Sequence, residues 1–343
     1  MSQYEETIFG QVPMKDAHSW KLLHHFLTPV LPFFEDPRVT EILVNRFDEV
    51  YIEIDGVLKR VDSMFGSDAK LVEFIRQLSV ILKQPFGEDS PELEARFPNG
   101  ARISCAHSIL TPAGASFSLR CKPEKPLTMD DLVGFGALTR EMADFIARHV
   151  RDASTMLVTG NTGAGKTALL RACGEFIDPR ERLCTAEDTL ELHMRERLEN
   201  VLAFEAPYRE PKEGRTPITL AACIRKFLRN RPDRGWVGEI RDAAACDAFF
   251  QFVYTGHRGS AASLHSNGPH DTVPRLQYLM ASAGLINYDL AGTMILKVLD
   301  LMVHCHRDPR FGRKITDICV VEDGVIKPVF TYDVEAGVHR RVD

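Results

Sequence analysis

The sequence predicts a small α+β domain followed by a larger α/β domain that is built on a mostly parallel sheet. Two observations lead to this fold class. Strand and turn signals dominate residues 1–122, whereas helix and strand patterns alternate from Leu138 onward. Residues 156–170, MLVTGNTGAGKTALL, then read as a buried strand, a glycine loop and a helix in direct succession. We place the domains at 1–122 and 137–343, joined by a proline-containing linker at 123–136.

The composition limits the classes of function. The 343 residues suffice for about two domains, and 44% apolar with 26% charged residues is ordinary for a soluble globular protein. A formal net charge of −6 gives no general affinity for nucleic acid or anionic membranes. The eight cysteines form no CxxC pair, which favours reduced thiols in a cytosolic protein. The sequence contains neither a secretory signal nor a membrane span, so we expect membrane association only through a partner.

The first domain is expected to begin with a loose polar arm over residues 1–19. A helical stripe follows over Trp20–Phe34, and Pro29 and Pro32 should kink it or end it early. Asp55-Gly56 lies between two β-rich runs, which is typical of a hairpin with a two-residue turn.

Further along the first domain, Asp68 is expected to cap a helix that reaches Leu82. A turn at 98–100 introduces a strand over 101–105. Residues 116–121 alternate strictly between apolar and polar side chains, which predicts a half-buried strand.

The second domain alternates helices with strands. Helices are predicted after the glycine loop and at 140–150, 220–228, 243–253, 272–281 and 289–299. Strands are predicted at 156–158, 182–186, 201–204, 236–237, 260–264, 301–306, 314–321 and 329–332. This pattern is typical of a sheet covered by helices on both faces.

The glycine loop matches the motif G-x-x-x-x-G-K-[ST], and its flanking strand and helix are the context that the motif requires. Backbone N–H groups of such a loop surround phosphates, and the following helix adds its positive end. Lys166 is placed for the β- and γ-phosphates, and the Thr167 hydroxyl for Mg²⁺. The residues predicted to contact a nucleoside triphosphate here are Gly160, Asn161, Thr162, Gly163, Ala164, Gly165, Lys166, Thr167 and Ala168.

Carboxylates follow the strand at 182–186, in the order Glu187, Asp188 and Glu191. At the carboxyl end of a parallel strand they face the ligand crevice, where they could hold Mg²⁺ or orient a water molecule. The alternative is a solvated acidic loop.

The strand at 236–237 leads into Gly238-Glu239-Ile240-Arg241, and we expect this strand to lie next to the nucleotide strand. No N-K-x-D box follows, which argues against a GTPase. His257 and His265 bracket the next strand, where they could sense the γ-phosphate or serve as structural histidines.

Together these motifs resemble the secretion ATPase superfamily, which powers type II and type IV secretion, conjugation and type IV pili. The likeness covers about residues 35–330. The matching segments are Gly160–Thr167 (Walker A), Glu187–Glu191 (Asp box), Arg229–Asp233 (R-x-R-P-D), Gly238–Arg241 (Walker B with glutamate), Thr255–His265 (His box), and in the first domain Asp36–Asn45, Asn99–Arg102 and Ser118–Arg120. The conjugation branch looks closest, with tight-adherence or type IV pilus ATPases as the near alternative.

The resemblance implies an ATP hydrolase with a PAS-like first domain, a RecA-like second domain and the nucleotide between them. It implies Glu191 as the residue that orients water, Glu239 as support for magnesium and the γ-phosphate, and nucleotide contacts from Arg102, Arg120, His257 and His265. The magnesium ligands implied are Thr167, Glu187, Asp188 and Glu239. It also implies a cytoplasmic homo-hexamer that works with inner-membrane components of a secretion or pilus machine.

Two questions stay open from the sequence. The basic residues near the Walker B strand fit a subunit interface or a solvated helix face; they are Arg225, Lys226, Arg229, Arg231 and Arg234. The rival functions are a RecA-like DNA-dependent motor, which the acidic net charge disfavours, and a scaffold that binds ATP without hydrolysis.

Overall fold

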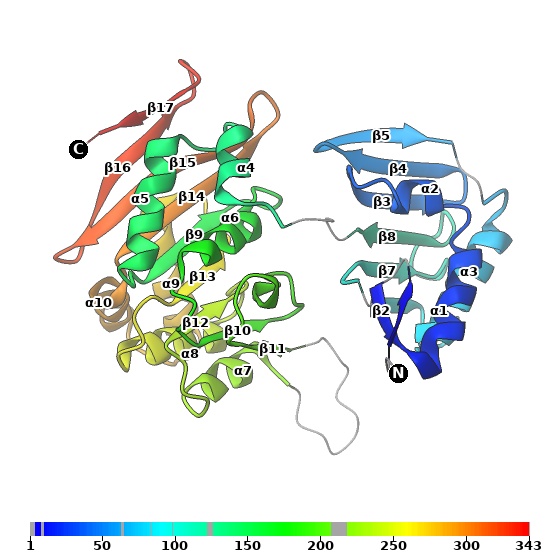
Figure 1. The fold of residues 1–343 in the computed structure, drawn as a ribbon, viewed down its shortest axis with the longest axis horizontal. Helices are drawn as coiled ribbons and strands as arrows, with labels where there is room; N and C mark the ends of the chain where they lie inside the picture. Colours follow the sequence, from blue (N-terminus) through cyan, green and yellow to red (C-terminus); the bar gives the residue numbers. More distant parts are fainter. Residues whose placement is uncertain are drawn as a thin grey trace. The chain divides into compact units, whose positions relative to one another are not determined.

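The computed structural model describes residues 4–7, 10–62, 65–82, 84–97, 99–121, 126–206 and 218–342. The chain divides into two compact units, Met1–Lys125 and Pro126–Asp343, and each contains its own sheet (Figure 1). The cysteines among the described residues are buried free thiols. Within the same residues, no helix is both long and apolar enough to cross a bilayer.

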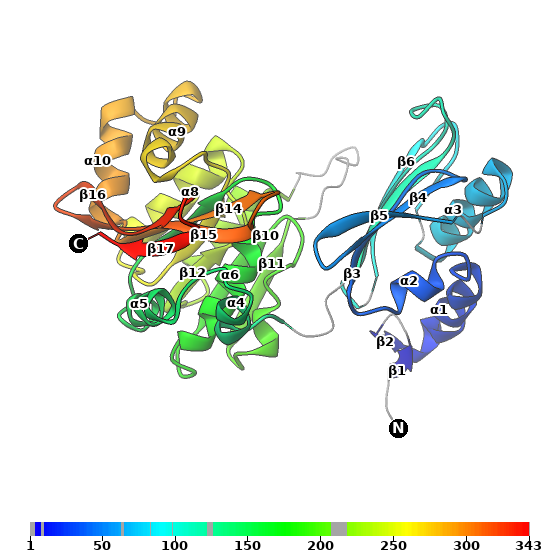
Figure 2. The ribbon, with the colours of Figure 1, turned by 90° about the horizontal axis from the view of Figure 1, so that it is seen from above.

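The first unit is built on an antiparallel sheet with strand order β5-β4-β3-β8-β7-β6, and α1 and α3 lie on one side of it (Figure 2). Apolar side chains of α3 pack on those of β3, β7 and β8 to form the core. The elements are β1 (Tyr4–Thr7), β2 (Gly10–Pro13), α1 (Met14–Phe26), α2 (Leu31–Phe34), β3 (Val39–Arg46), β4 (Glu49–Ile54), β5 (Val57–Val61), α3 (Asp68–Leu82), β6 (Glu92–Arg96), β7 (Arg102–Ala106) and β8 (Ser116–Arg120).

The hairpin predicted at Asp55-Gly56 is confirmed. Asp55 and Gly56 have φ values of 51° and 78°, as a hairpin turn between β4 and β5 requires. The helix α1 ends at Phe26 and a new helix, α2, carries a proline in its first turn. The expected loose arm is wrong over its described part, because β1 pairs with β2 and α1 begins at Met14; residues 1–3 and 8–9 lie outside the described residues.

The cap of α3 lies one residue earlier than expected. The Ser67 hydroxyl accepts the backbone N–H of Lys70 at 3.3 Å, which makes Ser67 the N-cap. Asp68 instead lies in the first turn, and its Oδ1 accepts the N–H of Ala115 at 3.0 Å. The Asp68 carboxylate, which the sequence predicts as the cap of α3, is therefore bonded to the distant residue Ala115.

The second unit carries one large mixed sheet with strand order β11-β10-β12-β13-β9-β14-β15-β16-β17. Its elements are α4 (Met129–Gly134), α5 (Arg140–Arg151), β9 (Met156–Gly160), α6 (Lys166–Cys173), the 3-10 helices η1 (Gly174–Phe176) and η2 (Met194–Glu196), β10 (Leu183–Glu187), β11 (Val201–Glu205), α7 (Leu220–Phe227), β12 (Arg234–Val237), α8 (Ala243–Tyr254), β13 (Ala261–Leu264), α9 (Pro269–Ser282), α10 (Tyr288–Val298), β14 (Leu301–Asp308), β15 (Gly312–Glu322), β16 (Val325–Asp333) and β17 (Val338–Arg341).

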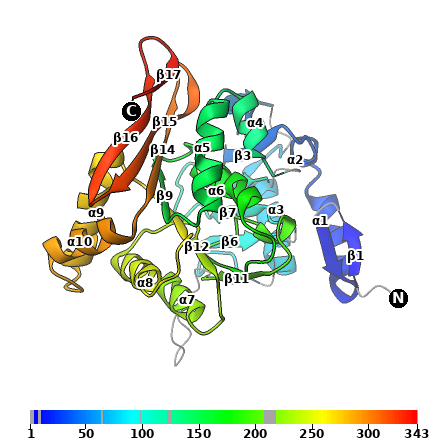
Figure 3. The same ribbon diagram turned by 60° about the vertical axis from the view of Figure 1, so that its left-hand side comes forward.

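The predicted mixed α/β architecture is confirmed. The strands from β11 to β14 run parallel, and β15, β16 and β17 extend the sheet as antiparallel neighbours (Figure 1 and Figure 3). Alternate residues of β9 point to opposite faces: Met156 and Val158 pack with α4–α6, and Leu157 packs with α7–α10. Helices thus bury both faces of the parallel part.

Two features of this unit depart from the expectations. The predicted linker contains α4, whose Thr128 and Asp131 form a reciprocal capping box and whose Met129 and Leu132 enter the core; residues 122–125 lie outside the described part. The strand β12 is not adjacent to β9, because β13 lies between them. The strand that leads to Glu239 is therefore separated from the P-loop strand by β13.

Candidate active site

The P-loop, residues 160–167, connects β9 to α6 with a backbone that glycine permits. Gly160, Gly163 and Gly165 have φ values of 146°, 70° and 97°. At Gly160 a Cβ atom would lie 2.0 Å from the carbonyl oxygen of Cys305 on β14, so a side chain is excluded there. The loop can therefore pass close to β14 and turn its N–H groups inward, as phosphate binding requires.

Lys166 begins α6 and is 8% exposed. Its Nζ donates to the carbonyl oxygens of Gly160 and Asn161, each at 3.1 Å, and lies 3.5 Å from Nδ1 of His265. Burial lowers the pKa of the lysine, and the charge of Glu239 opposes this. The ammonium group is thus held at the P-loop on weak neutral acceptors that phosphate oxygens can replace.

His265 joins Lys166 to Glu239 at the carboxyl ends of β13 and β12. Its Nε2 lies 2.7 Å from Oε1 of Glu239. Because the ammonium group can only donate, Nδ1 of His265 is the accepting nitrogen, which leaves the ring proton on Nε2. Nε2 is close to Oε1 of Glu239 but is not aligned for a hydrogen bond, and that buried oxygen has no hydrogen-bond partner among the described residues. Burial and the charge of Lys166 lower the pKa of His265, which fits a neutral ring.

Arg241 holds the other side of Glu239. Its Nε and Nη2 both donate to Oε2 of Glu239, at 3.0 and 2.7 Å, and these charge-assisted bonds hold that oxygen in place. Its Nη1 also lies 3.7 Å from Oδ2 of Asp188. Burial raises the pKa of Asp188, and Arg241 counteracts that rise. The sequence predicts Arg241 only as part of the Walker B box. Its position two residues after Glu239 is the sequence feature that indicates this contact.

Glu187 and Glu191 occupy different positions although both follow β10. Glu187 is 2% exposed, and its Oε1 accepts the backbone N–H groups of Glu191 and Leu192 at 2.8 and 2.9 Å. At Gly238 a Cβ atom would lie 2.9 Å from Cγ of Glu187, so the glycine makes room for this carboxylate. This arrangement fits a loop-holding role for Glu187 better than the predicted magnesium contact.

The loop that Glu187 holds brings Glu191 back to the start of α6. Thr167 Oγ1 donates to Oε2 of Glu191 at 3.3 Å. Thr167, Lys166, Glu191 and Glu239 therefore meet at one edge of the sheet, although β10 and β12 are separated from β9 in the strand order.

Several predicted site residues lie elsewhere. His257 precedes β13, so the length of that strand, about 13 Å, separates it from His265. Its ring stacks on Phe252 at 4.1 Å and its Nδ1 lies 3.2 Å from the Phe252 carbonyl oxygen, which is a structural setting at the end of α8. The structure does not support the predicted phosphate role of His257. Arg102 and Arg120 belong to the first unit, where β7 and β8 place them directly opposite each other.

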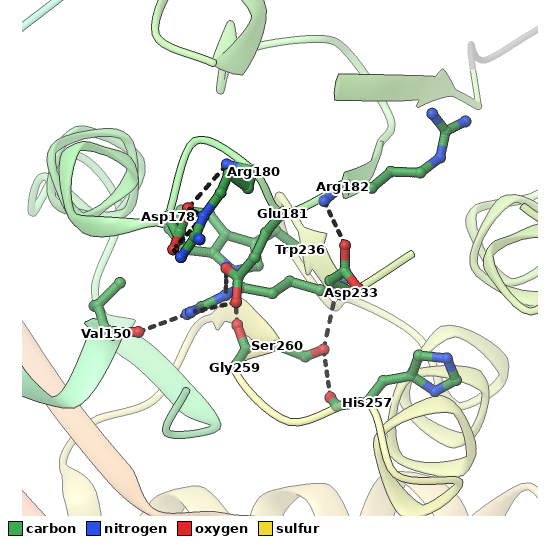
Figure 4. A network of polar contacts seen from close by, with 12 residues as sticks. Val150, Asp178, Arg180, Glu181, Arg182, Asp233, Trp236, His257, Gly259 and Ser260 are labelled. Carbon is green, nitrogen blue, oxygen red and sulfur yellow. Dashed lines mark hydrogen bonds and ion pairs between the residues drawn. The ribbon is translucent and has the colours of Figure 1, made fainter. Parts of the chain in front are cut away.

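The residues of the predicted basic cluster differ in their exposure to solvent. Arg225, Lys226, Arg229 and Arg231 are exposed, but Arg234 is 2% exposed. Arg234 donates through Nε and Nη2 to Glu181 at 2.5 and 3.1 Å and through Nη1 to the Val150 carbonyl at 2.5 Å. Figure 4 shows this network with Gly259 and Ser260 beside it. Arg234 is therefore a buried structural cation and cannot contribute to a surface patch.

The hairpin of β14 and β15 supplies P-loop contacts that sequence reasoning missed. Arg313 Nε donates to the Gly163 carbonyl at 2.8 Å. The Asn161 side chain bonds the backbone of Arg307, accepting its N–H at 3.2 Å. These contacts join residues about 150 positions apart, so no local pattern could have indicated them.

The donor set fits a magnesium nucleotide. Among the described residues, no three His, Cys, Asp or Glu side chains are arranged to hold a metal ion by themselves. Magnesium in phosphate sites is bound by one or two protein oxygens together with phosphate oxygens and water. The Thr167 hydroxyl with nearby carboxylates matches that requirement, and the P-loop amides with Lys166 match a triphosphate.

Known proteins resemble this chain over most of its length. A family model described as type II/IV secretion system protein matches residues 26–335. The type IV secretion system protein VirB11 of Brucella suis is 27% identical over 325 residues, covering 85% of this chain and 88% of that protein. A Mycobacterium tuberculosis protein, provisionally named for conjugal transfer, is 29% identical over 317 residues, covering 89% and 88%. The crystal structure of the Legionella pneumophila ATPase DotB shares the fold, with TM-score 0.65, 19% identity and coverage of 87% and 81%.

Proposed function

This chain belongs to the type II/IV secretion system protein family, and from that premise we propose that it is the ATPase of a type IV secretion or conjugation machine. The relatives named VirB11 and for conjugal transfer support that branch. ATP is the substrate, and hydrolysis to ADP and phosphate supplies the work.

The observation that carries the proposal is the chain of contacts from Lys166 through His265 to Glu239. A lysine cation, a neutral histidine and a carboxylate converge where the glycine loop would hold the γ-phosphate. In P-loop enzymes this position stabilises the charge that develops on the transferred phosphoryl group. A carboxylate that Arg241 holds beside this position can act on magnesium or on water during hydrolysis, which favours an ATPase over a protein that only binds nucleotide.

Each residue then has a defined task. The P-loop amides and Lys166 bind the β- and γ-phosphates, and Glu191 orients the attacking water and accepts its proton. Arg241 and His265 keep the Glu239 carboxylate aimed at the γ-phosphate side. Magnesium, when bound through Thr167, the phosphates and a carboxylate of Asp188 or Glu239, neutralises charge on the phosphate oxygens.

The finer assignments rest on the family. We propose that the second unit is RecA-like and the first PAS-like, that six copies form a ring, and that the ring works in the cytoplasm beside inner-membrane partners. In that ring Arg102 and Arg120 would approach the phosphates. Their placement side by side on one sheet face supports this, since paired guanidinium groups suit a polyanion.

The test is phosphate release by the purified full chain with ATP and magnesium, with and without DNA, alongside light scattering with an ATP analogue. We expect magnesium-dependent turnover that DNA does not stimulate, and a hexamer in the presence of nucleotide. Absence of turnover under all conditions would leave only the scaffold function, and strict dependence on DNA would favour a DNA motor.

A further inference from the structure

The boundary between β12 and β13 positions Glu239 relative to His265. The ladder pairs Trp236 with Ala261 and Val237 with Ala262. Glu239 follows β12 and His265 follows β13, so any slip or rotation at the end of this short ladder changes the distance between their side chains.

Ser263 binds the chain on both sides of Glu239. Its hydroxyl donates to the Gly238 carbonyl oxygen at 2.5 Å, and its own carbonyl accepts the N–H of Ile240 at 2.8 Å. The side chain is nearly inaccessible, with the residue 1% exposed. A buried hydroxyl without a partner is unfavourable, so this geometry is strongly preferred.

The bond to the Gly238 carbonyl bears directly on the glutamate. That carbonyl belongs to the peptide group that joins Gly238 to Glu239, and the orientation of this group sets φ of Glu239. Gly238 cannot be replaced by a stiffer residue, because Glu187 occupies the space a Cβ would need. A hydrogen bond from outside the loop therefore supplies a restraint that the glycine itself lacks.

We propose that Ser263 is a positioning residue for ATP hydrolysis, which holds the Gly238–Glu239 peptide so that the Glu239 carboxylate meets His265. The inference rests on the proposed function. The hydrogen bonds of Ser263 go to the chain on either side of Glu239, so its effect on ATP hydrolysis passes through Glu239, and binding of the nucleotide without magnesium should be unaffected.

Ser260, the residue directly before β13, offers a matched control. Ser260 is also buried, and its hydroxyl accepts the Gly235 N–H at 3.1 Å and donates to the His257 carbonyl at 2.8 Å (Figure 4). Each serine hydroxyl thus makes a hydrogen bond to the backbone in or next to β12: Ser260 to Gly235 and Ser263 to Gly238. Ser260 does so at the edge that carries Arg234, away from the reacting groups.

The experiment compares Ser263→Ala with Ser260→Ala in the full chain, measuring kcat, KM, affinity for a fluorescent ATP analogue and melting temperature. Ser263→Ala keeps the Ile240 backbone bond, so we expect a folded protein. Its kcat should fall at least about tenfold, within the ~10²-fold that an ångström of misplacement costs. Its affinity for the analogue measured without magnesium, where Glu239 has no metal to support, should change less than about twofold. Ser263→Thr keeps the hydroxyl and should retain more activity than the alanine variant.

Ser260→Ala should lower the melting temperature while kcat stays within about twofold of the wild type. Equal kcat in Ser263→Ala and the wild type, or equal losses of kcat in the two alanine variants, would overturn the positioning role. Absence of turnover in the wild type would instead refute the ATPase function itself, so the two failures are distinguishable.

Discussion

The two edges of the parallel sheet hold their charges in opposite ways. At the amino edge, Arg234 is buried and each of its three guanidinium nitrogens donates a hydrogen bond, to Glu181 or to the Val150 carbonyl, at 2.5–3.1 Å. At the carboxyl edge, Lys166 lies 3.5 Å from His265, and Thr167 lies 3.3 Å from Glu191. At the amino edge Arg234 lies in a closed network of short contacts. At the carboxyl edge the contacts of Lys166 with His265 and of Thr167 with Glu191 are long, although Glu239 is itself held closely, with Arg241 and His265 each 2.7 Å away.

The difference follows from what each edge has to do. A buried cation is stable only when its donors are satisfied, so the amino edge closes around Arg234, and Gly259 gives it room: a Cβ there would lie 2.9 Å from the guanidinium. Lys166 and Thr167 would exchange partners when a nucleotide binds, so their contacts in the protein must not be as tight. On the proposed function the carboxyl edge binds nucleotide and the amino edge stabilises the fold, and six substitutions, grouped in four predictions, test this division.

The largest effect is expected at Lys166. Lys166→Ala removes the cation that meets the β- and γ-phosphates, so phosphate release should fall to background while the fold survives. Circular dichroism checks the fold and a phosphate assay checks turnover. Wild-type turnover in a folded Lys166→Ala protein would contradict the assignment of the carboxyl edge as the binding edge.

The next effect separates the carboxylates of that edge. A general base contributes ~10²–10⁴-fold, so Glu191→Gln should keep ATP affinity and lose most hydrolysis. Glu239→Gln should in addition weaken magnesium-dependent binding. Paired measurements of affinity and phosphate release decide the roles, and they are reversed if Glu191→Gln hydrolyses normally while Glu239→Gln binds without turnover.

At the amino edge the expected effect is on stability. Glu181→Leu leaves the buried Arg234 without its carboxylate and should cost about 3 kcal/mol or more. Arg234→Met leaves Glu181, which is partly exposed, free to be hydrated, so the loss should be smaller. Chemical denaturation measures both. Turnover well below the melting temperature should stay within about twofold of the wild type, and a tenfold loss would show that the two edges are not separable.

The smallest effect concerns His304, which lies beneath the P-loop on β14 with Nδ1 2.8 Å from the Thr159 hydroxyl. Burial lowers the pKa of His304, so the folded state binds fewer protons than the unfolded state. Stability should therefore fall as the pH drops below the unfolded value of about 6.5 toward the folded pKa, by at most about 1.4 kcal/mol per pH unit for one proton.

Burial also lowers the pKa of His149, His265 and His339, so these residues change the stability with pH in the same direction. The difference between wild type and His304→Gln isolates the contribution of His304. The variant should lose less stability than the wild type between pH 7.5 and 5.5. Identical pH dependence in the two proteins would count against a neutral buried ring.

Much of the site could be predicted because its signals are local. The P-loop, the Asp55-Gly56 turn and the helix predicted at 243–253 depend on neighbours within a few residues, and the structure contains all three. The sequence does not predict β3, β6 or α4, nor three further strands that lack a local signal. The hairpin of β1 and β2 and the edge strand β17 have no distinctive turn or apolar signal, and pairing with a neighbouring strand defines them.

By itself, the sequence determined the nucleotide loop, the carboxylates that follow β10 and β12, and the family that these motifs resemble. Only the tertiary structure decided that β13 lies between β9 and β12, that Glu187 holds its own loop while Glu191 meets Thr167, and that His265 and not His257 reaches Lys166. It also decided that Arg234 is buried. The physical reason is that a short motif fixes backbone conformation through its own residues. Strand order and burial depend instead on which distant segments pack together, and a strand can pair with more than one neighbour.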